Sequence, residues 1–370
     1  MSSDGPADGG PDDDGGPDDD GGPADGGPAP AAVAVPAADL GWDDARRGPL
    51  NPPDGSAISR VAVVHRGAYE LTGPSGVLVG SVDAELRRTA RSPADFPAVG
   101  DWVVHGLEAR DDRRVAITRL LERHSAVVRR AAGAQPVPQI VAANVDVMAV
   151  VTTAALLTTG ADSDAGHRLE RYLVAAAEGS VRPVVVVNKA DLGLPDARRA
   201  ERALRRRVGA GARPVDVVVT SAVAGDGLAQ LAALAVDGAT LALAGASGVG
   251  KSSLVNRLLG RDIVETEAVG AGGRGRHTTV RRELFVMPAG TGTVIDTPGL
   301  QDLVPFTDGS TVGLDAVFAD VAGPARRCRF ADCAHRSEPD CAVRRAVAEG
   351  ELSQRRLDIY LEMRSDVGAT

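Results

Sequence analysis

A glycine-rich loop between an apolar strand and an apolar helix constrains the fold of this 370-residue chain more than any other feature. The run TLALA (240–244) leads into GASGVGKSS, and the helical pattern LVNRLLG follows. This is the G-x-x-x-x-G-K-[ST] pattern in the strand, loop and helix context that phosphate binding requires. Its glycines let backbone N–H groups surround phosphates, and the helix amino terminus favours anions. The predicted phosphate-binding residues are Gly245, Ala246, Ser247, Gly248, Val249, Gly250, Lys251, Ser252 and Ser253.

Two side chains of this loop have predicted roles. Lys251 is expected to reach the outer phosphates of a nucleotide, and Ser252 to ligate Mg²⁺. Lysine is otherwise rare, since only Lys189 and Lys251 among the 41 basic residues are lysines. Arginine serves wherever a solvated positive charge suffices, whereas these two positions favour a slim ammonium on a flexible stem.

Two further motifs follow apolar strands. Asp296 and Gly299 belong to a D-x-P-G sequence, which predicts a carboxylate near Mg²⁺ and a glycine near the γ-phosphate. The N-K-x-D sequence ends in Asp191, whose carboxylate would accept from N1–H and N2–H of guanine and reject adenine, which lacks these donors. The predicted guanine-binding residues are Asn188, Lys189, Ala190, Asp191, Ser221 and Ala222.

Continuous apolar strands alternate with amphipathic helices between residues 139 and 305. The strands are predicted at 145–152, 184–187, 215–220, 240–244 and 292–296. Strands that are apolar throughout, separated by helices, indicate a mostly parallel sheet with helices on both faces. The guanine motifs precede the phosphate loop here, whereas an ordinary GTPase begins with the phosphate loop. The sequence therefore predicts an α/β P-loop GTPase domain in circularly permuted order.

The segments before this domain differ from it and from each other. Residues 1–50 hold twelve Asp and two Arg, so the net charge of −9 arises from this end. Residues 1–55 repeat Gly, Pro and Asp and are expected to be disordered, as a solubilising tail or as an arm for basic partners. Short β-type runs over residues 58–131 indicate a small OB-type β-barrel. Its arginines suit RNA or form a solvated face; they are Arg87, Arg88, Arg91, Arg113, Arg114, Arg129 and Arg130.

All three cysteines of the chain lie within fourteen residues of one another, together with a histidine. The residues are Cys328, Cys333, His335 and Cys341. An odd number of cysteines so close together argues against disulfides, and three thiolates with one imidazole suit a closed, structural Zn²⁺ site. Buried, inert thiols are the alternative. A charged helical pattern follows at residues 342–365.

From about residue 56 onward the chain resembles the ribosome small-subunit-dependent GTPase A family, which are circularly permuted GTPases. The resemblance rests on the motifs above, on DFPAVGDWV (95–103), on AANVD (142–146) and on GRHTT (275–279), which matches the family's switch I. It implies an OB-type barrel, a zinc module with this Cys/His spacing, and action late in small-subunit maturation. The tail at 1–55 and the short stretch 301–327 depart from the family pattern.

The residue after the D-x-P-G glycine is Leu300, and this is where many GTPases have a water-orienting Gln. An aliphatic side chain cannot orient water, so slow intrinsic hydrolysis is expected. His277 is the candidate replacement, both from its Gly-rich loop and from the resemblance, unless it only touches RNA; Gln301 is a weaker rival. Thr278 or Thr279 should supply a ligand to Mg²⁺, and the spacing does not choose between them.

The expected domains are a tail at 1–55, an RNA-binding OB-type barrel at 56–135, a GTPase domain at 136–305 and a zinc-binding module at 306–370. The expected function is GTP hydrolysis stimulated by the small ribosomal subunit and its rRNA, with hydrolysis driving release. A GTP-gated scaffold with negligible turnover is the alternative, and an ATPase of nucleic-acid metabolism is a third hypothesis. No apolar run is long enough to span a membrane, and a cytoplasmic monomer is expected.

Overall fold

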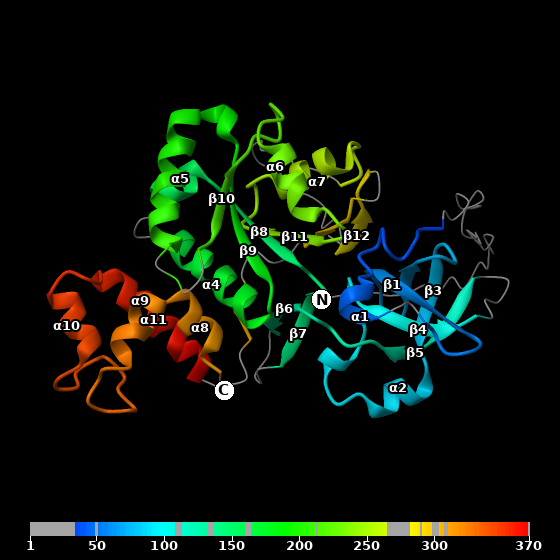
Figure 1. The fold of residues 1–370 in the computed structure, drawn as a ribbon, viewed down its shortest axis with the longest axis horizontal. Coiled ribbons are helices and arrows are strands. Elements are labelled where there is room, and N and C mark those ends of the chain that lie inside the picture. The colour runs from blue at the N-terminus through cyan, green and yellow to red at the C-terminus, as the bar shows by residue number, and fades with distance from the viewer. Residues whose placement is uncertain are drawn as a thin grey trace, which may run out of the picture. The chain divides into compact units, whose positions relative to one another are not determined.

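The computed structural model describes residues 34–48, 51–107, 113–131, 137–159, 164–209, 211, 214–264, 282–288, 291–297, 303–306 and 310–368. Within these ranges the chain forms a barrel, an α/β domain and a helical carboxy-terminal module (Figure 1). None of the described helices is both long and apolar enough to cross a membrane.

Six neighbouring strands form the sheet of the α/β domain. They are β8 (Val147–Thr153), β9 (Arg182–Asn188), β10 (Asp216–Val219), β11 (Thr240–Gly245), β12 (Glu283–Val286) and β13 (Thr293–Asp296). Their order is β10-β9-β8-β11-β13-β12. The first five are parallel, and β12 is antiparallel to β13. This confirms the predicted sheet, although β12 was not among the predicted strands.

Helices cover both faces of this sheet. They are α3 (Ala154–Thr159), α4 (Asp164–Glu178), α5 (Leu194–Val208), α6 (Leu228–Ala232) and α7 (Lys251–Leu259). Val185 and Val187 of β9 pack with apolar residues of α4 and α5, whereas Val184 and Val186 pack with those of α6 and α7. Figure 1 shows the two helix pairs on opposite sides of the strands. Burial on both faces explains why these strands are apolar throughout.

A closed five-stranded barrel precedes the α/β domain. Its strands are β1 (Ser56–Val64), β2 (Tyr69–Thr72), β3 (Leu78–Val82), β4 (Trp102–Gly106) and β5 (Arg114–Leu120), with α2 (Ala84–Thr89) after β3. Pairing of β1 with β4 closes the barrel, and β3 is parallel to β5. This is the predicted OB-type architecture. β1 also pairs with β12 through Val63 and Glu283, so the barrel continues the sheet.

Residues 34–48, here called the strap, lie in the range for which the sequence predicts disorder. The structure instead packs them on the barrel. Leu40 is fully buried, and the ring of Trp42 meets that of Trp102 edge-on at 5.0 Å between centroids. The strap includes α1 (Asp44–Arg47). The expected tail boundary at residue 55 was therefore too late, because two large apolar side chains are enough to anchor this segment.

A two-stranded hairpin and four helices complete the described chain. The hairpin consists of β6 (Ala126–Arg130) and β7 (Pro138–Ala143) and lies between the barrel and the α/β domain in sequence. The carboxy-terminal helices are α8 (Val312–Val317), α9 (Ala319–Ala325), α10 (Ala342–Ala348) and α11 (Gln354–Gly368). The helical pattern expected at 342–365 is thus two helices, separated near Gly350, which has a φ of 77°.

Candidate nucleotide site and metal centre

The phosphate loop begins where β11 leaves the sheet. At Gly245, which has a φ of 141°, a Cβ would lie 2.2 Å from the carbonyl oxygen of Val151. At Gly250, which precedes α7 and has a φ of 95°, a Cβ would lie 2.5 Å from Nδ2 of Asn188. Both positions therefore need glycine for backbone conformation and for space. The sharp turn this permits aims the amino end of α7 at the loop.

Lys251 lies at the start of α7 and is 9% exposed. Its Nζ donates to the carbonyl oxygens of Gly245, at 2.9 Å, and Ala246, at 2.8 Å. Asp296 ends the neighbouring strand β13 in register with Leu243 of β11. Burial raises the pKa of Asp296, and the positive charge of Lys251 opposes that rise. An ammonium and a carboxylate thus share the carboxyl edge of the sheet, as the phosphate and Mg²⁺ motifs require.

Asn188 links the base motif to the phosphate loop. It ends β9, is 2% exposed, and donates from Nδ2 to the carbonyl oxygen of Val249 at 2.9 Å. Its Oδ1 accepts from the hydroxyl of Thr220 at 3.1 Å and from the backbone N–H of Ala222 at 3.3 Å. One buried amide therefore holds three loops together. Thr220 was not singled out from the sequence; its place at a strand end, just before Ser221, was the available signal.

Asp191 is exposed, and its carboxylate is oriented by Ser221. The hydroxyl of Ser221 donates to Oδ1 of Asp191 at 2.5 Å, and Ser221 itself is fully buried. Lys189, in the same N-K-x-D motif, has a left-handed backbone with a φ of 62°. The carboxylate is thus fixed in direction while one oxygen remains available to a ligand.

The structure brings together most of the predicted nucleotide residues. Ser252 and Ser253 are half-buried at the start of α7, next to Lys251, and Ser247 is exposed in the loop. Other predicted residues lie outside the described ranges, namely His277, Thr278, Thr279, Gly299, Leu300 and Gln301.

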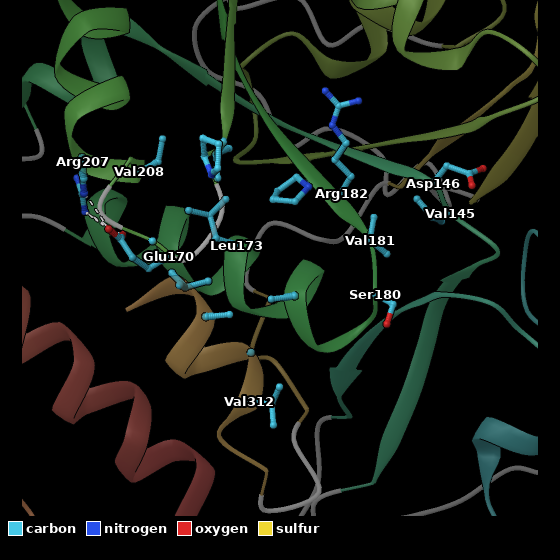
Figure 2. A pocket seen from close by; sticks show the side chains of 18 of the residues that line it. Val145, Asp146, Glu170, Leu173, Ser180, Val181, Arg182, Arg207, Val208 and Val312 are labelled. Atoms are coloured by element: carbon cyan, nitrogen blue, oxygen red, sulfur yellow. Dashed lines mark hydrogen bonds and ion pairs between the residues drawn. The ribbon is translucent and has the colours of Figure 1, made fainter. Parts of the chain in front are cut away.

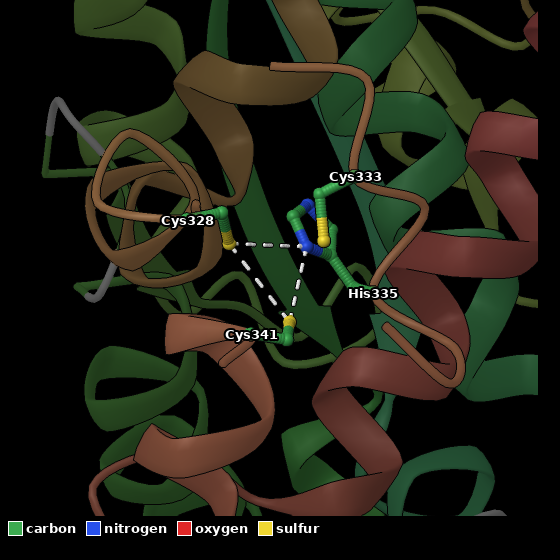
Figure 3. A group of neighbouring side chains, drawn as sticks. All are labelled: Cys328, Cys333, His335 and Cys341. Carbon is green, nitrogen blue, oxygen red and sulfur yellow. Dashed lines mark hydrogen bonds between the residues drawn. The ribbon is translucent and has the colours of Figure 1, made fainter. Parts of the chain in front are cut away.

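The three cysteines and His335 form one cluster in the carboxy-terminal module (Figure 3). Their ligand atoms all lie within 4.8 Å of one another. Nδ1 of His335 lies 3.6 Å from Sγ of Cys328 and 3.5 Å from Sγ of Cys341, and these two sulfurs are 3.9 Å apart. The cluster can hold one metal ion, as the spacing of the residues predicts.

The protein environment affects the thiols of this cluster differently. Burial raises the pKa of Cys333 to about 11, with the neighbouring thiols adding to the effect. Burial also acts to raise the pKa of Cys328, but backbone N–H groups of Val343 and Ala342 outweigh it and lower that pKa. These N–H groups lie in the first turn of α10, where anions are favoured. A metal ion would hold all three as thiolates.

A cavity of about 780 Å³ is lined by residues outside the nucleotide motifs (Figure 2). Its lining includes Asp146, just before β8, and Arg182, the first residue of β9. The cavity is therefore at the amino edge of the sheet, opposite the phosphate loop. At its other end the buried carboxylate of Glu170 pairs with Arg207, with both hydrogen bonds at 2.8 Å. The sequence did not single out this cavity, because its lining comes from distant segments.

A parallel sheet that carries a phosphate loop and an N-K-x-D motif at the ends of its strands defines a P-loop GTPase, here with its motifs in circularly permuted order. Residues 120–304 match the family model described as RsgA GTPase. The chain belongs to the RsgA GTPase family and is a GTPase.

Two relatives show the extent of this similarity. Both carry the name small ribosomal subunit biogenesis GTPase RsgA. The protein from Opitutus terrae is 40% identical over 341 residues, which cover 89% of either chain. The protein from Streptomyces avermitilis is 40% identical over 331 residues, 89% of this chain and 85% of the relative.

Two solved structures are similar to this fold. YjeQ from Thermotoga maritima has a TM-score of 0.60 at 25% identity, over 85% of this chain and 99% of its own. YloQ, described as a circularly permuted GTPase, has a TM-score of 0.57 at 26% identity, over 85% and 96%. The permuted order read from the motifs is thus confirmed.

Proposed function

We propose that this chain hydrolyses GTP in the maturation of the small ribosomal subunit, binds the rRNA of that subunit, and leaves it after hydrolysis. The observation that carries the nucleotide part is Asn188, whose buried amide joins the base motif to the phosphate loop. Relatives that cover most of this chain, and are named for small-subunit biogenesis, support the ribosomal part.

In this proposal the guanine base is read by Asp191. Its carboxylate, held by Ser221, accepts from N1–H and N2–H of guanine, and the segment Ser221–Ala222 offers a backbone N–H to the guanine oxygen. Lys189 lies along the base or against the phosphate loop. The loop from Gly245 to Ser253 surrounds the phosphates.

Hydrolysis transfers the γ-phosphoryl group from GTP to water, and GDP leaves as the bond to the β–γ bridging oxygen breaks and the bond to water forms. Lys251 exchanges the carbonyls of Gly245 and Ala246 for phosphate oxygens and offsets their charge. When bound, Mg²⁺ neutralises charge on the β- and γ-phosphates, and Ser252, Asp296 and one of Thr278 and Thr279 are its proposed protein ligands. Gly299 is proposed to contact the γ-phosphate.

The attacking water needs a group to orient it, and we assign this role to His277. The aliphatic Leu300 cannot perform it. If the assignment holds, His277→Ala lowers turnover by about 100-fold or more while the Kd for GTP changes little. A Gln301→Ala variant is the matched comparison, and a loss confined to that variant would reassign the role.

The metal of the cysteine cluster is proposed to be one structural Zn²⁺. Ligand atoms about 2.0–2.3 Å from a tetrahedral zinc lie roughly 3.5–3.8 Å apart. The three separations among Cys328, His335 and Cys341 are 3.5, 3.6 and 3.9 Å, and all four ligand atoms lie within 4.8 Å of one another. Metal analysis should find one zinc per chain. Cys333→Ser should lose it and unfold the module, whereas a chain folded equally well without metal would contradict the proposal.

The proposed setting is the cytoplasm, and the protein is proposed to act as a monomer. The barrel offers exposed arginines to rRNA phosphates, namely Arg66, Arg87, Arg88, Arg91, Arg113, Arg114 and Arg119. Solution mass from sedimentation, compared with the 37.9 kDa of one chain, tests the monomer.

The deciding experiment measures GTP turnover with and without purified small subunits. Acceleration by subunits supports the proposed enzyme, and turnover that subunits leave unchanged supports the scaffold alternative.

The base assignment is tested separately with Asp191→Asn. An amide can donate to O2 of xanthine where the carboxylate accepted from N2–H of guanine, so preference should shift from GTP to XTP. Asp196→Asn, an exposed acid on α5, is the matched control. Unchanged GTP preference in Asp191→Asn would contradict the assignment.

A further inference from the structure

A small cavity of about 250 Å³ lies beside the metal cluster. It is lined by α8, α9, α11 and the knuckle, a name used here for residues 326–341. Its lining includes Asp315, Arg326, Phe330, Cys333, Tyr360 and Arg364. Cys328 and Cys341 are not among them, so the cavity is next to the metal position. It is smaller than the roughly 300–1,000 Å³ of sites for drug-sized ligands, which suits a single ring system.

The rim of this cavity carries an unusual aromatic residue. All ten Phe, Tyr and Trp residues of the chain lie in the described ranges, and Phe330 alone among them is exposed, at 40%. The guanidinium of Arg329 lies 5.5 Å from the centroid of its ring. Aromatic rings and guanidinium planes are the two surfaces on which proteins stack unpaired bases.

The floor of the cavity is polar and already oriented. The hydroxyl of Thr311 donates to Oδ2 of Asp315 at 3.0 Å, and the carboxylate of Asp315 is also hydrogen-bonded to Tyr360. Arg364 donates to the carbonyl oxygen of Cys333 at 3.1 Å. An acceptor and a donor thus lie side by side below the aromatic rim, as the edge of a base requires.

The charge around the cavity favours a polyanion. Residues 326–345 include six arginines and three acidic residues. Arg326 lines the cavity and is exposed, and Arg327 and Arg329 follow it on the same exposed segment. Such a cluster beside a stacking ring matches the alternation of base and phosphate in a single strand.

We propose that this cavity binds one unstacked base of single-stranded RNA. The base stacks on Phe330, its edge meets Asp315 and Arg364, and the adjoining phosphate pairs with Arg326. The choice of RNA as the polyanion rests on the proposed function, since that function places the chain on a particle built on rRNA. The geometry of the cavity is independent of it.

The test measures binding of a short, fluorescently labelled, single-stranded RNA of mixed sequence to the full chain, at several stated ionic strengths. Phe330→Ala should raise the Kd about fivefold or more, whereas Phe330→Tyr should retain binding. Arg326→Ala should weaken binding and reduce the salt dependence by about one released counterion. Leu107→Ala, at an exposed apolar residue after β4, and Arg206→Ala, at an exposed arginine of α5 outside this arginine cluster, are the matched controls.

An abasic version of the same RNA separates stacking from charge. It should bind the wild-type chain and Phe330→Ala with similar Kd. If Phe330→Ala raised the Kd for the abasic strand as much as the Kd for the intact strand, Phe330 would act without a base and the proposal would be wrong. An unchanged Kd of Phe330→Ala for the intact strand would also contradict it. Loss of subunit binding with naked RNA binding intact would instead indicate a protein partner.

Zinc content and thermal unfolding of each variant show whether the module is folded. The Kd for GTP is measured in parallel and tests the proposed function alone. If the chain binds GTP and Phe330→Ala leaves its RNA affinity unchanged, the base-binding proposal is wrong and the GTPase proposal stands. If the chain binds no GTP, the proposed function is wrong, and the RNA measurements still decide whether the cavity binds a base.

Discussion

The GTPase sheet meets its neighbours at two junctions that are built in opposite ways. At the amino-terminal junction Arg60 of the barrel is 1% exposed, and its guanidinium donates to five acceptors from five segments. The acceptors are the carbonyls of Leu40, Gly100 and Asn144 and the hydroxyls of Thr240 and Thr293. Burial lowers the pKa of Arg60 to about 9, opposed by the charge of Asp146, so the group stays charged at neutral pH.

At the carboxy-terminal junction, the buried carboxylate of Glu170 pairs with two partly exposed arginines beside a cavity. Arg356 of α11 lies 3.4 Å from Glu170 of α4 and also pairs with Asp320 of α9. The side chain of Arg207, the other partner of Glu170, is 30% exposed. The cavity of about 780 Å³ lies against the same groups and against α8, the first helix after the D-x-P-G motif.

The difference shows where this molecule can adjust. Displacing the barrel would leave buried donors and acceptors without hydrogen-bond partners, which is costly. Displacing α8 is expected to cost less, because a cavity lies beside it and Arg207, one partner of Glu170, reaches water. We therefore expect the barrel to move with the GTPase domain, and the carboxy-terminal module to respond to the nucleotide.

The largest expected effect is at Arg60. Arg60→Ala leaves five acceptors without their donor and should lower the free energy of unfolding by about 3–5 kcal/mol. Denaturant titration measures it, with Arg66→Ala, an exposed arginine of the same barrel, as control. A loss below about 1 kcal/mol would mean that the two junctions are alike.

Replacing one alanine with leucine at each junction should change the free energy of unfolding differently at the two junctions. Ala142→Leu, at a fully buried position of β7, should destabilise by about 1–3 kcal/mol through overpacking. Ala177→Leu lines the large cavity and should be neutral or stabilising by up to about 1 kcal/mol. Equal losses of unfolding free energy would indicate that the cavity is closed in solution.

Glu170→Gln should have a smaller effect than the change at Arg60. The amide keeps the shape of the side chain, Arg207 can turn to water and Arg356 keeps its pairing with Asp320, so a loss of about 1–2 kcal/mol is expected. Glu201→Gln, whose partners are the exposed Arg198 and Arg205, is the comparison and should lose less. A loss as large as that of Arg60→Ala would contradict the proposed contrast.

The smallest effect concerns pH at the amino-terminal junction. His105, 1% exposed, is hydrogen-bonded through Nε2 to the hydroxyl of Ser59, next to Arg60, at 2.9 Å. Burial lowers the pKa of His105, against the carbonyl of Gly106, which raises it. The unfolded chain, with a pKa near 6.5, therefore takes up a proton before the folded chain, and stability falls as the pH drops below about 6.5.

Replacing this histidine tests the assignment. His105→Gln should flatten the dependence of unfolding free energy on pH below about 6.5. An unchanged slope in His105→Gln would show that other groups cause the acid sensitivity.

Local signals made the nucleotide motifs and the parallel strands predictable. Val184–Val187 are apolar on both faces, and the glycines at 245 and 250 are required by their own backbone. The cysteine cluster was equally local, because its ligands lie within fourteen residues. Such features depend on few distant partners.

The junctions could not be predicted because their energetics are not local. Arg60 reads as one more solvated arginine in the sequence, and its burial depends on acceptors far away in the chain. The strap reads as part of an acidic tail, and only the surface of Trp102 gives Trp42 a place to pack. β12 has four residues and takes its strand form from two neighbours, β13 and β1.

The positions of the Arg60 acceptors in the sequence also determine when its hydrogen bonds can form during synthesis. Thr240 is 180 residues and Thr293 is 233 residues downstream. At roughly 5–20 residues per second, a nascent barrel waits on the order of ten seconds or more for the last hydroxyl. Until then Arg60 lacks part of its set of acceptors, so a chain that stops before Thr293 has an incomplete amino-terminal junction. The barrel therefore completes its contacts only after β13 of the GTPase domain has been synthesised.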